Sequence, residues 1–139
     1  MTAAQNKAIV TAIYQAMAEG DGRPFVDAMA EDFTWIIEGT NSWSRSWRGR
    51  DNVRRELLRP LFDQFATPYR ARAERIIAED DTVVVLAKGE VTTKAGKPYN
   101  NSYCFVIRLA DGKMIELREY LDTELVAAAL EPLPEPAAA

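Results

Sequence analysis

The sequence of 139 residues contains no histidine and a single cysteine, Cys104. Without imidazole there is no histidine general base, no Ser-His-Asp or Cys-His catalytic arrangement, and no zinc or iron site built on histidine. One cysteine excludes an intrachain disulfide and a cysteine metal cluster. Acid–base chemistry must therefore come from carboxylates, lysine or tyrosine, and we expect neither a cofactor nor a metal ion.

Positive charge is also scarce, since 17 Lys and Arg stand against 21 Asp and Glu, a net charge of −4. Phosphate binding needs a clustered basic face, so we expect no nucleic-acid partner. No run approaches the roughly 18 apolar residues of a membrane span, and residues 1–10 lack the apolar core of a signal peptide. We therefore expect a cytoplasmic protein without a membrane partner. The G-x-G-x-x-G, Walker and G-x-S-x-G motifs are absent.

Apolar residues make up 47% of the chain, which suits one domain of ordinary size with a real core. Helical spacing of apolar residues comes first, and alternating apolar residues follow. This order predicts an α+β fold in which N-terminal helices cover one face of a curved, mainly antiparallel sheet. The single domain spans 1–130, and the Pro- and Ala-rich end, 131–139, predicts a disordered tail. The expected helices are 3–19, 24–30 and 51–65, broken at Pro60; the expected strands are 33–38, 69–78, 82–93, 99–109 and 113–122, with a loop at 39–50.

The last strand carries a carboxylate on an otherwise apolar face. Successive side chains of a strand point to opposite faces, so Ile115, Leu117, Glu119 and Leu121 share one face. A carboxylate there needs a partner or a raised pKa, and both occur at functional sites. The other interpretation, a structural ion pair or a face that opens to water, stays open.

The strand 82–93 repeats this anomaly, because Lys88 and Glu90 share a face with Val84 and Leu86. In an antiparallel meander these two charged side chains would meet Glu119 across the intervening strand. Two carboxylates and one cation in an apolar cavity push pKa values apart, which gives one acid and one base. We therefore take Glu119, Glu90 and Lys88 as candidate catalytic residues. A surface Lys–Glu pair at the sheet edge is the alternative.

Polar and aromatic side chains predict the wall of a ligand pocket. Asn101, Tyr103 and Phe105 share one face of the strand 99–109, and a Tyr hydroxyl at a pocket wall can orient a substrate oxygen. A Tyr in a strand also packs simply as a hydrophobe. Two Trp in a Gly/Ser-rich loop need cover, so they line a pocket mouth, pack on the third helix or enter a subunit contact. The candidate substrate-binding residues are Trp35, Ile37, Trp43, Trp47, Asn101, Tyr103, Phe105, Leu121 and Tyr14.

Two blocks of sequence resemble a known superfamily. The motif AEDFTW at 30–35, followed by WRGRD at 47–51, is similar to SnoaL-like proteins. The motifs GKPYN at 96–100, DGK at 111–113 and REYLD at 118–122 resemble limonene-type epoxide hydrolases. Over roughly residues 5–130 the chain resembles the nuclear transport factor two-like, cone-shaped α+β fold. That fold hosts ketosteroid isomerases, SnoaL-type polyketide cyclases and epoxide hydrolases, and also proteins that are not enzymes.

The epoxide hydrolase resemblance carries over onto the same charged residues. In those enzymes an Arg and an Asp two apart on one strand work with an Asp on the last strand, and these positions fall on Lys88, Glu90 and Glu119. All three are substituted, and a Lys cannot fork between two carboxylates as an Arg does. The Tyr and Asn that hold water in that family fall on Trp35 and Ile37 here.

The isomerase and cyclase resemblances imply other candidates. A ketosteroid isomerase needs a carboxylate near the end of the first strand, where Glu38 is nearest, and a Tyr close to the helix position of Tyr14. A polyketide cyclase needs one acid in an apolar pocket, which Glu119 or Glu90 would supply.

Two hypotheses about function follow. The first is a protein that binds a small apolar or polycyclic metabolite in the cone, with cofactor-free acid–base catalysis of the hydrolase, isomerase or cyclase type. The second is a non-catalytic binding or dimerisation module of the same fold. The resemblance also implies a homodimer through the outer sheet face, which would carry Ser102, Cys104, Val106, Arg118 and Tyr120.

Overall fold

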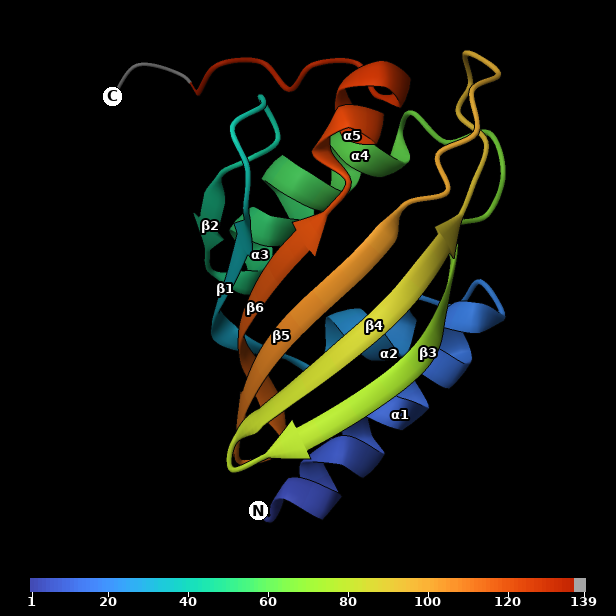
Figure 1. Cartoon of the computed structure of the whole chain (residues 1–139). Coiled ribbons are helices and arrows are strands. Elements are labelled where there is room, and N and C mark those ends of the chain that lie inside the picture. Colours follow the sequence, from blue (N-terminus) through green and yellow to red (C-terminus); the bar gives the residue numbers. More distant parts are fainter. Residues whose placement is uncertain (137–139) are drawn as a thin grey trace.

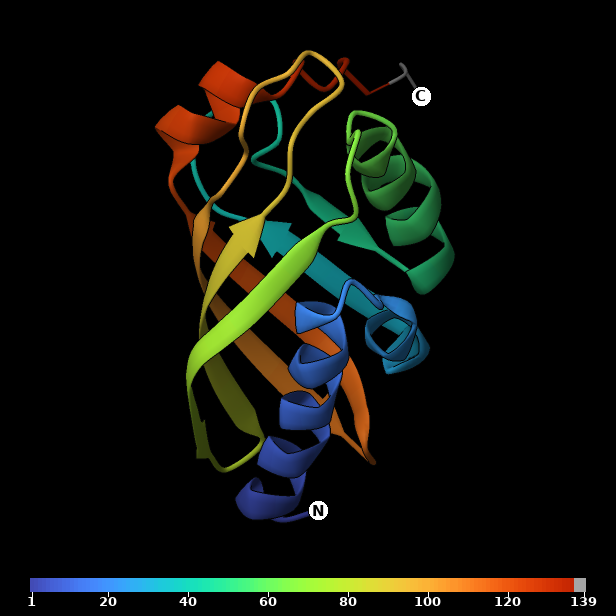
Figure 2. The ribbon, with the colours of Figure 1, turned by 90° about the vertical axis from the view of Figure 1, so that its right-hand side faces the viewer.

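A strongly curved sheet forms the framework, and helices cover one of its faces (Figures 1 and 2). The structure is a computed structural model, and it describes residues 1–136. Within them the sheet has six strands in the order β2-β1-β6-β5-β4-β3. β1 pairs with β6 in parallel, and the other neighbouring strands are antiparallel. The predicted α+β class with a mainly antiparallel sheet is confirmed. The bounds are β1 Met29–Ile37, β2 Ser46–Arg48, β3 Arg70–Glu79, β4 Thr82–Glu90, β5 Ser102–Ala110 and β6 Lys113–Leu121.

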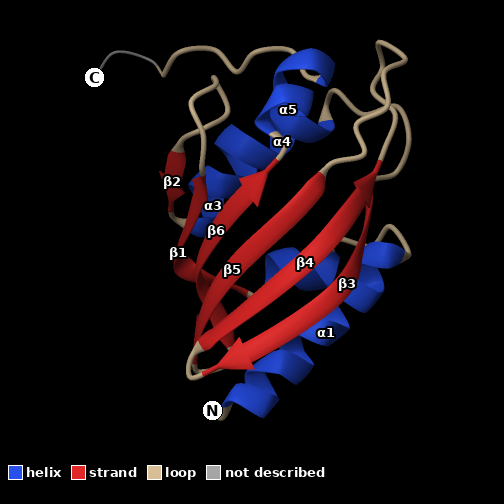
Figure 3. Cartoon of the chain, viewed as in Figure 1, coloured by secondary structure: helices blue, strands red, loops and turns tan. Residues whose placement is uncertain are grey.

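The first helix, α1 (Ala3–Ala18), packs along β3 and β4. Thr2 and Gln5 form a capping box at its start, and Gly20 just beyond its end has a φ of 83°, which glycine adopts without strain. Its buried side chains fall at helical spacing: Asn6, Val10, Ile13, Tyr14 and Met17. The short α2 (Arg23–Asp27) follows and contacts α1; all helices are blue in Figure 3.

The helix expected over 51–65 consists of three consecutive segments: α3 (Arg50–Asn52), the π-helix η1 (Val53–Leu58) and α4 (Arg59–Phe62). Pro60 explains the break, because it lacks an N–H and its ring clashes with the carbonyl four residues earlier. A π-helical turn widens the backbone at this point, and such turns occur often at functional sites.

Several elements differ from the sequence-based expectations. α2 ends at Asp27 and β1 already starts at Met29, within the helix expected over 24–30. The loop expected at 39–50 contains β2, which pairs Trp47 with Trp35 of β1. The helix α5 (Thr123–Ala129) follows β6 and was not predicted, although Asp122 caps it by accepting a hydrogen bond from the N–H of Leu125. β5 starts three residues later than expected, because side chains bind the backbone there: Asn100 accepts from the N–H of Val91.

The chain after α5 makes defined contacts as far as the structure describes it. The backbone of Glu131 accepts a hydrogen bond from the Trp43 indole (3.0 Å). The N–H of Leu133 donates to Ser42, and the Arg45 guanidinium donates to the carbonyl of Leu133. Residues 131–136 therefore differ from the disordered tail expected for 131–139, and residues 137–139 lie outside the described residues.

The outer face of the sheet carries the residues expected at a homodimer contact. Tyr120, Cys104 and Leu86 lie opposite one another across β6, β5 and β4. Tyr120 and Leu86 are among the exposed large hydrophobic side chains. The homodimer itself stays a prediction.

Among the described residues, no helix combines the length and the apolar character needed to cross a membrane.

Candidate functional site

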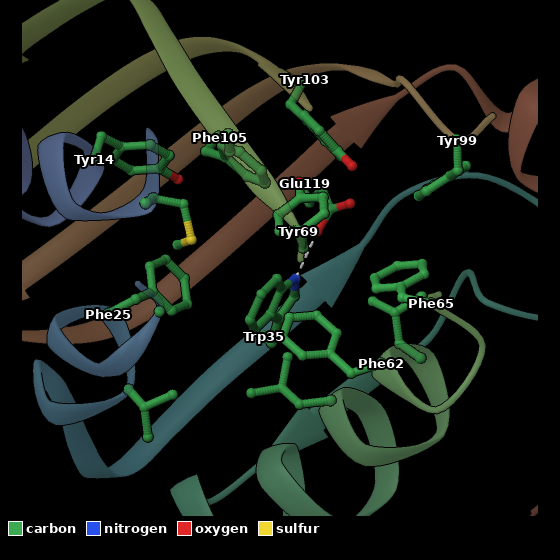
Figure 4. Close-up of a pocket in the computed structure, with 16 residues that line it drawn as sticks. Tyr14, Phe25, Trp35, Phe62, Phe65, Tyr69, Tyr99, Tyr103, Phe105 and Glu119 are labelled. Atoms are coloured by element: carbon green, nitrogen blue, oxygen red, sulfur yellow. Dashed lines mark hydrogen bonds between the residues drawn. The ribbon is translucent and has the colours of Figure 1, made fainter. Parts of the chain in front are cut away.

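An aromatic cavity of about 90 Å³ lies between the helices and the sheet (Figure 4). The sheet supplies side chains from β1, β3, β5 and β6, and the helical layer supplies side chains from α1, α2, η1 and α4. The wall is almost entirely apolar, with one carboxylic acid and the hydroxyls of four tyrosines. The lining residues are Tyr14, Met17, Gly22, Phe25, Val26, Trp35, Leu58, Leu61, Phe62, Phe65, Tyr69, Ala71, Tyr99, Tyr103, Phe105 and Glu119.

Glu119 is the only acid in this wall, and its side chain is 6% exposed. The indole Nε1 of Trp35 donates a hydrogen bond of 2.9 Å to Oε1 (Figure 4). Among the described residues no cation lies within ion-pair distance of this carboxyl. Burial raises the pKa of Glu119 from 4.5 to about 7, although the hydrogen bond from Trp35 lowers it. Both protonation states are therefore populated near neutral pH.

The second carboxyl oxygen of Glu119, Oε2, accepts no hydrogen bond from a described residue. Among residues 1–136, the only fully buried side-chain polar atom without a hydrogen-bond partner is Oδ1 of Asn6. Because Oε2 of Glu119 also has no partner, it is not fully buried, and it is therefore accessible from the cavity. One oxygen fixes the carboxyl against Trp35, and the other can give a proton to a ligand or take one from it.

The four tyrosines of the wall stay protonated. Tyr14 comes from α1, Tyr69 precedes β3, Tyr99 precedes β5 and Tyr103 lies in β5. Burial is the largest cause that raises the pKa of each hydroxyl well above 10, and the negative charge of Glu119 adds to it. Each hydroxyl therefore keeps a proton that it can donate in a hydrogen bond across the range in which Glu119 titrates.

Gly89 lets two of these hydroxyls converge on the inner side of β4. A Cβ atom at this position would lie 3.0 Å from the hydroxyl oxygen of Tyr69 and 2.9 Å from a ring carbon of Tyr103. It would also lie 3.2 Å from the hydroxyl oxygen of Tyr103. Glycine inside a strand often marks such a close approach. Any larger residue would displace one of the two tyrosines.

Asn101 acts behind the cavity wall. Its side chain is fully buried, and its amide nitrogen donates to the hydroxyl of Tyr99 (3.2 Å) and to the carbonyl of Asp122 (3.1 Å). Its Oδ1 accepts from the backbone N–H of Ser102 and of Asp122. Asn101 therefore positions Tyr99 and joins β5 to the end of β6, instead of lining the cavity as expected.

The charged trio expected from the sequence does not form. The buried residues of β4 are Val83, Val85, Ala87 and Gly89, so Lys88 and Glu90 point to the outer face. The Lys88 ammonium donates to the hydroxyl of Ser102, also outside. The prediction that these two residues meet Glu119 in the cavity is wrong.

A family model for the SnoaL-like domain matches residues 10–117, which is most of the chain. The chain belongs to the SnoaL-like family. Among curated proteins, none matches its sequence significantly. Among solved structures, an NTF2-like protein from Burkholderia xenovorans LB400 is 25% identical, with a TM-score of 0.70. The match covers 93% of this chain and 98% of that one.

Two further solved structures have the same fold at lower identity. A proposed SnoaL-like polyketide cyclase from Jannaschia sp. CCS1 is 20% identical, with a TM-score of 0.74, over 96% of this chain and 94% of that one. A proposed isomerase from Bacillus subtilis is 18% identical, with a TM-score of 0.75, over 93% and 95% of the two chains. At these identities the likeness shows the SnoaL-like fold alone.

The other candidate ligand contacts of this SnoaL-like chain divide into two groups. Tyr14, Trp35, Tyr103 and Phe105 line the cavity. Ile37, Trp43, Trp47 and Leu121 do not line it. Ile37, Trp43 and Trp47 are buried core residues, and the indole N–H of Trp43 donates its hydrogen bond to the carbonyl of Glu131.

Sequence reasoning missed the aromatic residues that close the cavity: Phe25, Phe62, Phe65, Tyr69 and Tyr99. The last four form a chain of neighbouring rings with centroids 5.4 to 6.3 Å apart. One signal was available, since Leu58, Leu61, Phe62 and Phe65 repeat at helical spacing. Whether these side chains line a cavity or fill a solid core depends on the tertiary fold, which the helical spacing does not determine.

Proposed function

We propose that this SnoaL-like protein binds a small cyclic metabolite with a carbonyl or enol oxygen in the aromatic cavity, and that Glu119 transfers protons on that ligand. The observation that carries the proposal is the position of Glu119, the lone acid of an apolar wall, with one oxygen held by Trp35 and the other accessible. The wall favours an apolar ring, and the volume of about 90 Å³ favours a single ring, because typical ligand pockets measure roughly 300–1,000 Å³.

The proposed step is a proton transfer without a cofactor. The carboxylate of Glu119 takes a proton from a carbon next to the carbonyl, and the electron pair of that C–H bond moves to form an enolate. Tyrosine hydroxyls such as those of Tyr69 and Tyr103 donate hydrogen bonds to the enolate oxygen, where negative charge develops. The protonated Glu119 then returns the proton to the same or to another carbon. In a ligand with a C=C bond next to the enolate, return of the proton to the far carbon of that bond gives isomerisation. Alternatively, the enolate carbon attacks a second carbonyl of the ligand, and Glu119 gives its proton to the alkoxide that forms, which completes a cyclisation.

Hydrolysis of an epoxide by two cooperating carboxylates is not part of this proposal. That mechanism needs a second acid and a cation beside Glu119, and the charged candidates Glu90 and Lys88 lie on the outer face of β4. The solved relatives agree with proton transfer, since two are described as a proposed polyketide cyclase and a proposed isomerase. A further structure of this fold, TerC, was co-crystallised with polyporic acid.

The test is the exchange of α-protons for deuterium in cyclohexanone dissolved in D₂O, followed by proton NMR. General acid–base catalysis by one group contributes about 10²–10⁴-fold. Glu119→Gln keeps the shape of the side chain and accepts the Trp35 hydrogen bond, so we expect it to lower the enzyme-catalysed exchange rate at least 100-fold.

Glu90→Gln is the matched control, because the same chemical change occurs outside the cavity, and we expect an unchanged rate. An equal loss of exchange rate in both variants would instead support the sequence-based hypothesis that Glu90 and Glu119 act together. Binding of cyclohexanone without faster exchange in the wild type would refute catalysis and leave the non-catalytic binding module.

A further inference from the structure

Phe62 stands where the cavity meets the surface. Its ring lines the cavity, yet 46% of the residue is exposed. The same residue lines two surface hollows next to the cavity, of about 250 and 510 Å³. Phe62 therefore stands between the cavity and two hollows that are more open to solvent.

The local backbone explains why a large apolar ring remains half in water. Phe62 ends α4, directly after the π-helical turn and Pro60. Its ring lies 5.4 Å from that of Phe65 and 5.9 Å from that of Tyr69, measured between centroids, and Figure 4 labels the three residues. These contacts hold the ring across the wall from its inner side, while solvent lies on its outer side.

Gly22 forms the opposite side of the same opening. It also lines the cavity and both hollows, and no atom lies within 4 Å of the position that its Cβ would take. Its φ of −89° is accessible to any residue, so the backbone does not require glycine here. The space next to Gly22 is therefore open at the position where a side chain would begin.

We propose that the gap between Gly22 and Phe62 is the entrance of the cavity, and that Phe62 is a specificity-determining residue that limits the ligand to one ring. The inference deepens the proposed function and rests on it. The larger of the two hollows also indicates the chemistry that a ligand would meet outside this entrance. It is lined by charged side chains of both signs, including Arg54, Arg59 and Asp63. A longer ligand would thus carry an apolar ring inside and a polar end outside.

The test compares phenol, with one ring, and 2-naphthol, with two, by calorimetric titration of the full chain. Phe62→Ala joins the cavity to both hollows, so we expect the ratio of the two Kd values to shift at least tenfold toward 2-naphthol. Gly22→Leu places a side chain in the gap and removes no side chain from the cavity wall. We expect it to slow the association of phenol at least tenfold in stopped-flow fluorescence.

Ile77→Ala is the matched control, because Ile77 is 43% exposed on β3 and lies outside the cavity. It should leave both quantities unchanged. An unchanged ratio of Kd values in Phe62→Ala, or an unchanged association rate in Gly22→Leu, would overturn the entrance. Binding of phenol to the wild type would at the same time uphold the ligand binding on which the proposed function depends. If Phe62→Ala does not fold, the association rate of phenol with Gly22→Leu tests the entrance by itself. If the wild type and both variants bind neither phenol nor 2-naphthol, the proposed function is refuted together with the entrance.

Discussion

Replacement of Glu119 by glutamine should stabilise the protein at neutral and alkaline pH. The pKa of this carboxyl is 4.5 in an unperturbed chain and about 7 in the folded protein. Between these values the folded state holds a proton that the unfolded state has lost, so the free energy of unfolding falls as pH rises. At 1.36 kcal/mol per pKa unit, the fall amounts to about 3 kcal/mol.

The sign follows from the raised pKa. The stabilisation from protonated Glu119 is complete below pH 4.5 and is lost as pH rises through about 7. A glutamine has no charge to desolvate, and its carbonyl oxygen can accept the hydrogen bond from Trp35. The variant should therefore match the wild type near pH 4 and exceed its free energy of unfolding by up to about 3 kcal/mol at pH 8.

Urea denaturation of both proteins, followed by circular dichroism at pH 4, 6 and 8, measures this difference. Because the other carboxylates are common to both proteins, their titration cancels when the two curves are subtracted. A difference that does not depend on pH would show that Glu119 titrates normally in the folded state. A variant less stable than the wild type at pH 8 would contradict the reasoning outright.

Three further perturbations test the groups around this acid. Trp35→Phe removes the hydrogen bond that lowers the pKa of Glu119, so the midpoint of the pH profile for α-proton exchange should rise by about one unit. Gly89→Ala should lower the free energy of unfolding by about 1–3 kcal/mol in urea, because its Cβ meets two tyrosines, whereas Gly22→Ala should change it by less than about 0.5 kcal/mol. Asn101→Ala leaves two backbone N–H groups without acceptors and should cost at least about 2 kcal/mol, so an unchanged urea midpoint would contradict its positioning role.

Strand parity located Glu119 correctly because β6 alternates regularly around it: Leu117 and Glu119 are buried, and Arg118 and Tyr120 are not. Nearer the start of the strand a register shift against β5 breaks the alternation, so Met114 is buried instead of the expected Ile115. A single acid on such a face is visible in the sequence. The hairpin at Asp111 and Gly112 was equally visible, since both residues adopt the positive φ that a tight hairpin turn requires.

The same reasoning failed on β4 because that strand is apolar on both faces. Residues 83–87 are all aliphatic, so periodicity does not distinguish the inner face from the outer. The inner face proved to be the one that continues into Gly89, where the missing side chain makes room for the tyrosines. The glycine, and not the charged residues beside it, was the informative position.

The element boundaries were lost where side chains replace backbone pairing. Asn101 takes hydrogen bonds that a regular strand would give to its neighbour, so β5 starts later than expected, and its amide orients Tyr99. Tyr69 reaches the cavity from the residue before β3, and Phe62 from the end of an interrupted helix. Such positions have no periodic signature, since they depend on how separate elements meet.

The energetics of Glu119 favour a chemical role for it over a structural one. Above pH 7 the ionised Glu119 lowers the free energy of unfolding by about 3 kcal/mol. Packing alone does not explain such a residue, because glutamine would fill the same space and accept the same hydrogen bond. No described cation offsets the charge, and the wall of aromatic rings maintains the desolvation. The destabilisation is the same interaction that places the pKa at about 7, where a carboxyl both takes and gives a proton. Stability and proton transfer are thus opposed at one residue, and a variant that gains the first should lose the second.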